Sequence, residues 1–164
     1  MQNFEARNYR IDNVELNWAK LSKPVNPFGT EQWELQVATT DKAVADDWSA
    51  NHFNVKQDKV DTSKFTISLK RKAVKANGDA NAPVRIVDAA ANALSPEKIA
   101  QIGNGSTGNV IVYQYPYSTA GREGIANSLT AVQIVDFKEY TAPTDFEPIT
   151  AVDPIENSSN EMPF

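Results

Sequence analysis

The amino-acid sequence predicts a mainly β protein, built as a small barrel or sandwich with one or two short helices. Two observations predict this class. About five or six segments have the alternation or the β-branched and aromatic content of strands, and clusters of glycine, proline and asparagine separate them. The chain has 164 residues, of which 41% are hydrophobic, so it can form one domain with a core but not two full ones.

Two predicted strands open the chain. In residues 11–21 the apolar side chains from Val14 to Trp18 recur at spacing two, and prolines and a glycine then mark a loop. Residues 31–39 repeat the spacing, with the apolar side chains from Trp33 to Val37 on one face. We expect Trp33 to lie in the core.

A short helix and a third strand follow. Residues 41–51 form the predicted helix, because Asp41 can cap it and Trp48 falls on its apolar face, where it is expected to be buried. The single histidine, His52, follows this helix and has the pattern of an ordinary surface or half-buried residue. Residues 65–75 form a strand whose apolar face contains Phe65, Ile67 and Leu69, with lysines on the other face.

The rest of the chain contains a second helix and three strands. Residues 84–87 form a short strand after a loop. A helix starts at Ser95, which can cap it ahead of a proline, and ends at Gly103. The last two predicted strands are residues 110–117 and 129–140, with a glycine-rich link that includes Gly121 and Gly124.

Charge divides the chain at Tyr140. Every lysine and arginine lies at or before Lys138, so the five acidic residues after Tyr140 account for the whole net charge of −5. Residues 1–140 are therefore expected to be the folded domain, and residues 141–164 a disordered, flexible acidic tail rich in proline. The tail is either an end without a role or, because it ends in an aromatic residue, a segment that docks on a partner.

Composition excludes several kinds of chemistry. The chain has no cysteine and one histidine, so disulfides, thiolate metal sites and most histidine-based catalysis are excluded. We expect no enzyme, no cofactor and no metal. No apolar run is long enough to cross a membrane, and the N-terminus is polar and lacks the features of a signal peptide, so a cytosolic location is expected.

The run from Gly103 to Gly108 fits the GxGxxG pattern. Dinucleotide binding requires a strand before this pattern and a helix after it. Here a predicted helix precedes it and a predicted strand follows, so we interpret it as a glycine turn that enters a strand.

An aromatic row and a basic strand indicate binding. Tyr113, Tyr115 and Tyr117 alternate on one face of a strand whose other face holds valines, so they can form a stacking platform for bases. Lys70 and Lys72 share one strand face and can follow a phosphate backbone. The tyrosines could equally stack on sugars or pack inward, and the lysines could be an ordinary solvated face.

Six segments together carry a resemblance to a known family. They are Trp18-Ala19-Lys20-Leu21, Pro83-Val84-Arg85-Ile86-Val87-Asp88, Ile102-Gly103-Asn104-Gly105-Ser106, Tyr115-Pro116-Tyr117, Gly124-Ile125 and Leu129-Thr130-Ala131-Val132-Gln133. With them, the chain from Val14 to Tyr140 resembles the single-stranded DNA-binding proteins of tailed bacteriophages. The tip from Met162 to Phe164 is similar to that of bacterial single-stranded DNA-binding proteins, although only Glu161 supplies nearby acidic charge.

The resemblance implies an OB-fold, five-stranded barrel that binds single-stranded DNA without sequence preference in phage replication, recombination and repair. It also implies a tail that competes with DNA and recruits replication proteins such as the polymerase and helicase-primase, in the host cell cytoplasm. A weak homo-oligomer is possible. The alternatives are a carbohydrate-binding β-sandwich and a phage structural or decoration protein.

The site residues follow from residue type and strand face. The predicted stacking residues are Trp18, Tyr113, Tyr115 and Tyr117. The predicted phosphate-binding residues are Lys20, Lys70, Lys72, Arg85 and Arg122. The predicted partner-binding residues of the tail are Asp153, Glu156, Glu161, Pro163 and Phe164.

Overall fold

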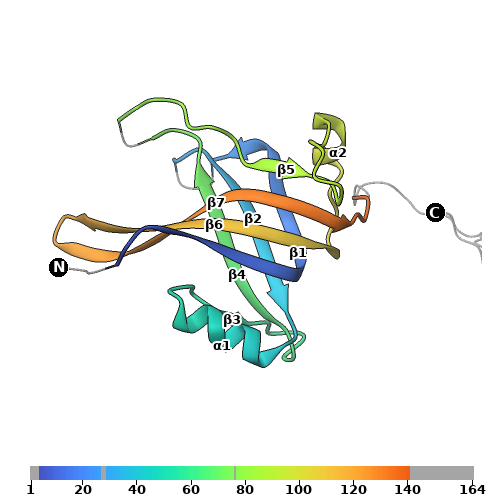
Figure 1. The fold of residues 1–164 in the computed structure, drawn as a ribbon, viewed down its shortest axis with the longest axis horizontal. Coiled ribbons are helices and arrows are strands. Elements are labelled where there is room, and N and C mark those ends of the chain that lie inside the picture. Colours follow the sequence, from blue (N-terminus) through green and yellow to red (C-terminus); the bar gives the residue numbers. More distant parts are fainter. Residues whose placement is uncertain (1–3, 27–28, 76, 141–164) are drawn as a thin grey trace, which may run out of the picture.

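A computed structural model of the chain describes residues 4–26, 29–75 and 77–140. Its elements, shown in Figure 1, are β1 (Arg7–Val25), β2 (Gln32–Thr39), α1 (Lys42–Ala50), β3 (Lys56–Gln57), β4 (Phe65–Lys72), β5 (Arg85–Val87), α2 (Pro96–Ala100), β6 (Ser106–Thr119) and β7 (Arg122–Asp136). The predicted mainly β class with two short helices is confirmed. The predicted tail, residues 141–164, lies outside the described residues.

Five of the strands close into a barrel. The order β4-β2-β1-β6-β7 is antiparallel throughout, and a parallel bridge from Lys70 of β4 to Ser128 of β7 closes the ring. The short strands β3 and β5 add to the outer sides of β4 and β7. The closed five-stranded barrel confirms the predicted OB fold.

The core fills the barrel with the side chains that alternation assigned to the inner faces. Val37, Ile67 and Val110 are among its fully buried members. Trp33 and Trp48 are also buried, as predicted. Both predicted helix caps are confirmed, because the side chains of Asp41 and Ser95 accept hydrogen bonds from the first turns of α1 and α2.

Several predicted boundaries are wrong. β1 starts at Arg7 and continues to Val25, because its two edges pair with different strands, β6 and β2. The predicted glycine-rich link is instead the tip of a long hairpin. Ala120 and Gly121, both with positive φ, connect β6 directly to β7, and Gly124 lies within β7. Helix α2 ends at Ala100, before the predicted stop.

The glycine run between α2 and β6 has the predicted context, with a helix before it and a strand after it. Gly108 lies inside β6 against β7, and a Cβ there would overlap the backbone carbonyl oxygen of Gln133. A glycine is required for this close approach of two strands, which explains the third glycine without a dinucleotide. Within the described part of the chain, no helix is long and apolar enough to cross a membrane.

Candidate nucleic-acid interface

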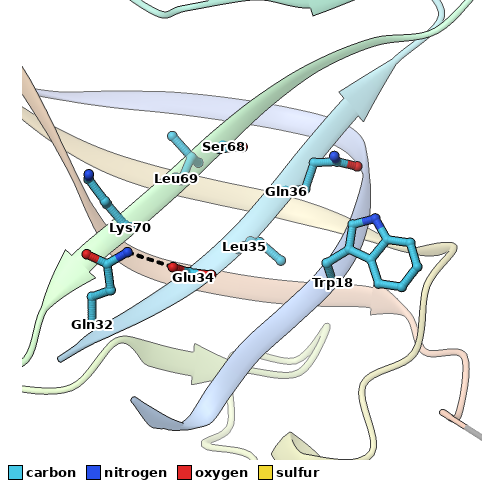
Figure 2. A pocket seen from close by; sticks show the side chains of 8 residues that line it. All are labelled: Trp18, Gln32, Glu34, Leu35, Gln36, Ser68, Leu69 and Lys70. Atoms are coloured by element: carbon cyan, nitrogen blue, oxygen red, sulfur yellow. Dashed lines mark hydrogen bonds between the residues drawn. The ribbon is translucent and has the colours of Figure 1, made fainter. Parts of the chain in front are cut away.

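A groove crosses the outer face of β1, β2 and β4. The residues that line it are Trp18, Gln32, Glu34, Leu35, Gln36, Ser68, Leu69 and Lys70. Figure 2 shows the indole of Trp18 on one side of the groove and Lys70 and Gln32 on the other. The groove therefore has an aromatic wall, a polar floor and a cationic wall.

The groove floor follows from the alternation of β2. Trp33, Leu35 and Val37 point into the core, so Gln32, Glu34 and Gln36 point to the opposite face, where Gln32 is buried and the other two are half-buried. The amide of Gln32 donates a hydrogen bond to the Glu34 carboxylate at 2.6 Å. These polar residues are not among the predicted site residues, although the spacing of the buried side chains identifies their face.

Register places two of the predicted lysines beside Glu34. Lys20 of β1 and Lys70 of β4 are its cross-strand partners on either side. Lys72 lies two residues beyond Lys70 and pairs with Gln32. Because cross-strand partners share a sheet face, these three lysines surround the groove with positive charge interrupted by one carboxylate.

Trp18 is exposed because β1 is bulged. The spacing of Val14, Leu16 and Trp18 predicts one shared face, but the first two are buried and Trp18 is 61% exposed. The register of β1 with β2 shifts after Asn17, and Trp18 has a φ of 51°, in the left-handed region. A bulge inserts a residue and reverses the alternation, which moves the indole from the core to the groove.

The tyrosine row lies on the outer face of β6, as predicted. Tyr113, Tyr115 and Tyr117 are about 40% exposed, and the rings of the first two stack with centroids 5.6 Å apart. Among the described residues, the part of the hairpin from residue 115 to residue 126 pairs only with itself. Figure 1 shows it projecting beyond the barrel as an arm. We call residues 113–126 the tyrosine arm.

The groove and the tyrosine arm meet at Ser128. Lys70 of β4 and Tyr113 of β6 are both register partners of this serine, from opposite sides of β7. The positions Lys20, Glu34, Lys70, Ser128 and Tyr113 thus form one row around the barrel. A polymer that lies along this row passes from the groove to the base of the arm.

The two predicted arginines lie away from the groove. Arg122 stands at the tip of the arm, opposite Thr119, and Arg85 lies on β5, opposite Ala131. Both side chains are exposed. Arg71, the middle residue of the basic run on β4, has a structural role, since it donates hydrogen bonds to Ala82, Asn81 and Ser128. The predicted tail residues lie outside the described part of the chain.

The shifted ionisable groups lie outside the groove lining. Burial and a hydrogen bond to Asp47 raise the pKa of Tyr9 to about 12. Burial opposes ionisation of Glu15, but hydrogen bonds from Asn17 and Lys64 hold the pKa of that carboxyl below its ordinary value. In the described ranges, no three side chains of the metal-binding types gather into a possible metal site.

The barrel and groove together define an OB-fold protein, a class that binds oligonucleotides or oligosaccharides on this sheet face. The single-stranded DNA-binding protein of bacteriophage Enc34, in complex with single-stranded DNA, has a TM-score of 0.59 and 14% identity, over 84% of this chain and 89% of that one. The C-terminally truncated form of the Enc34 protein has a TM-score of 0.58 and 15% identity, over 87% of this chain and 88% of that one. The single-stranded DNA-binding protein gp2.5 of bacteriophage T7 has a TM-score of 0.55 and 14% identity, over 92% of this chain and 100% of that one.

The resemblance to phage single-stranded DNA-binding proteins is therefore confirmed at the level of the fold. No family model and no curated protein matches the chain.

Proposed function

We propose that this protein binds single-stranded DNA without sequence preference, in the groove beside Trp18 and along the row that leads from Lys20 to the tyrosine arm. The observation that carries the proposal is the continuity of this row, in which Lys70 and Tyr113 flank Ser128. The Enc34 protein, which shares the fold, is described in complex with single-stranded DNA. Both the row and this neighbour favour DNA over the other polymers that the fold class accepts.

The proposed chemistry divides between rings and cations. Trp18 and the three tyrosines present faces on which bases of any sequence can stack. Lys20, Lys70 and Lys72 supply the cations that displace counterions from phosphates. Arg122 extends the phosphate contacts to the tip of the arm, and Arg85 contacts only DNA that continues past β7. This division gives affinity without a sequence code, because no base edge needs to be recognised.

The wider role follows the same proposal. The protein protects and organises single-stranded DNA in phage replication, recombination and repair, in the host cell cytoplasm, and it is not an enzyme. The acidic segment 141–164 competes with DNA for the basic groove, and its end recruits replication proteins such as the polymerase and helicase-primase. The support for the tail's part is its charge, since it carries the entire net charge of −5.

Tryptophan fluorescence offers a direct test. Trp18 is exposed and the other two tryptophans are buried, so quenching by poly-dT reports on the groove. The titration is performed at two salt concentrations, on the full chain and on a chain that ends at Tyr140, with Trp18→Phe as the control for the buried tryptophans. We expect salt-sensitive quenching that Trp18→Phe abolishes, and tighter binding without the tail.

The outcomes separate the alternatives. Salt-independent quenching by an oligosaccharide, with none by DNA, would establish the carbohydrate-binding reading instead. If neither polymer binds either chain, the DNA proposal fails and a phage structural or decoration role takes its place. Binding that the truncation leaves unchanged would retain the groove and remove the competition by the tail.

A further inference from the structure

Strand β1 contains two bulges of the same construction. At each one the register shifts and a residue has a positive φ, 56° at Asn13 and 51° at Trp18. At each one an asparagine side chain from the start of β6 or the turn before it accepts the hydrogen bond from that residue's N–H. Asn109 accepts from Asn13 at 3.0 Å, and Asn104 accepts from Trp18 at 2.7 Å.

The two bulges differ in how well their residue suits the conformation. Asparagine enters the left-handed region readily, whereas a bulky side chain there is an outlier that its surroundings must enforce. A bulged residue also loses its partner in the strand ladder, and an unpaired N–H is costly. The Asn104 carbonyl supplies the missing acceptor, so it stabilises the one backbone conformation that turns Trp18 outward.

The turn that carries Asn104 is itself fixed on both sides. Its next residue, Gly105, donates its N–H to the buried side chain of Asn17 at 3.0 Å, so the bulge and the turn exchange hydrogen bonds. On the far side, the N–H of Gly103 donates to the Lys138 carbonyl at 2.7 Å. Asn104 is therefore presented by a rigid turn, although its own side chain lies on the surface.

We propose that Asn104 is the positioning residue of Trp18, which it holds in the outward orientation needed to stack on a base of single-stranded DNA. The inference rests on the proposed function for the base, but the orientation of Trp18 is a property of the free protein. The glycine-rich run thus has a function other than binding a dinucleotide, since it places one asparagine under the backbone of one tryptophan. Asn104 need not touch DNA to have this effect.

The first experiment needs no DNA. The protein is labelled with 5-fluorotryptophan, and its three ¹⁹F resonances are recorded, with that of Trp18 assigned from Trp18→Phe. Asn104→Ala is expected to shift or broaden the Trp18 resonance and leave the other two unchanged. The matched control is Asn109→Ala, which removes the same hydrogen bond from the other bulge and should leave Trp18 unchanged. Asn104→Asp, which keeps the acceptor oxygen, should restore the wild-type resonance.

The second experiment measures coupling in binding. Affinity for a fluorescein-labelled dT oligonucleotide is measured by anisotropy for wild type, Asn104→Ala, Trp18→Ala and the double variant. We expect Asn104→Ala to weaken binding about three- to tenfold, part of the effect of losing a stacked base. In the Trp18→Ala background, Asn104→Ala should leave the affinity unchanged. A general loss of structure would instead lower the affinity equally in the wild-type and Trp18→Ala backgrounds.

The ¹⁹F spectra and the DNA affinities distinguish a failure of the proposed function from a failure of the inference about Asn104. If wild type does not bind the oligonucleotide, the proposed function fails, and the ¹⁹F spectra still test the orientation of Trp18. If wild type binds and Asn104→Ala changes neither the Trp18 resonance nor the affinity, Asn104 is not the positioning residue. Equal effects of Asn104→Ala and Asn109→Ala on Trp18 would also overturn the inference.

Discussion

Tyr117 and Gly124 are cross-strand partners in the tyrosine arm, and the tyrosine ring lies over the glycine backbone. A Cβ at Gly124 would lie 2.7 Å from the hydroxyl oxygen of Tyr117 and 2.8 Å from two of its ring carbons. A strand interior ordinarily disfavours glycine. Here its missing side chain allows the ring to lie flat against the arm, which fixes the orientation of the last tyrosine in the row.

Gly124→Ala should therefore move Tyr117 and weaken DNA binding. We expect a loss of affinity of about five- to tenfold, in the lower part of the range that stacking one base contributes. The arm should still fold, because alanine restricts the unfolded chain more than glycine does. Anisotropy titration with a dT oligonucleotide measures the effect, and Tyr117→Ala is the reference background. An equal loss from Gly124→Ala in that background would show that the change does not act through Tyr117.

Tyr115, the middle residue of the tyrosine row, can be compared with an exposed tyrosine elsewhere on the surface. Tyr115 is 38% exposed on the arm, and Tyr140 is 52% exposed outside the arm and the groove. Tyr115→Ala should cost about 1–3 kcal/mol of binding free energy if a base stacks there. Tyr140→Ala should cost nothing measurable. Unchanged DNA affinity in a Tyr115→Ala, Lys72→Ala double variant would remove both residues from the interface.

Glu34 is expected to oppose DNA binding. Its register partners are Lys20 and Lys70, so its carboxylate lies where phosphates would approach two cations. Glu34→Gln removes this charge with little change of shape and should tighten binding, most at low salt. The matched control is Glu97→Gln on α2, which should not tighten it. Weaker binding by Glu34→Gln at all salt concentrations would indicate that the carboxylate contacts the DNA bases instead.

The sequence predicts most of the barrel because alternation follows directly from burial on one face. The strands that contain Leu35, Ile67 and Val112 are all found this way, with their inner faces correct. The predicted strands cover only part of the arm, because β6 continues to Thr119 and β7 already starts at Arg122. Its strand from residue 122 to residue 127 buries no side chain fully, so it has no apolar alternation to detect, and pairing with β6 makes it a strand.

For the candidate site, residue spacing predicts which face of a strand a side chain occupies, but not which strands lie side by side. Alternation correctly predicts that Tyr113 and Lys70 are exposed. Their pairing with the same residue, Ser128, arises only when the barrel closes. Trp18 shows the opposite case, because its spacing from Leu16 gives it the core face, so its predicted stacking role rests on residue type alone, and a bulge exposes it. A bulge leaves no pattern in a single strand, since it is defined by the register of two.

Alkaline pH should weaken the fold through Tyr9. The pKa of Tyr9 is raised from 10.0 to about 12 by burial and then by its hydrogen bond to Asp47, so the folded state favours the protonated phenol. Its contribution is complete below about pH 10 and is lost as pH rises toward 12. Denaturation of wild type and Tyr9→Phe across this window should show the stability difference shrinking as pH rises. Tyr140→Phe is the control, and a constant difference for Tyr9→Phe would contradict the assigned shift.

The strained backbone conformation at Trp18 is expected to lower the stability of the fold while supporting DNA binding. Trp18 has a φ of 51° and is 61% exposed, so its side chain contributes little burial to offset the conformational cost. Asparagine adopts this conformation more readily, and relieving such strain is worth about 1–3 kcal/mol. Trp18→Asn is therefore expected to unfold at the same or a higher denaturant concentration than wild type. Its affinity for a dT oligonucleotide should fall about tenfold or more, as expected when a stacking platform is lost. Lower stability together with unchanged affinity would mean that Trp18 serves the fold, because a residue kept in a costly conformation for binding should lose binding first.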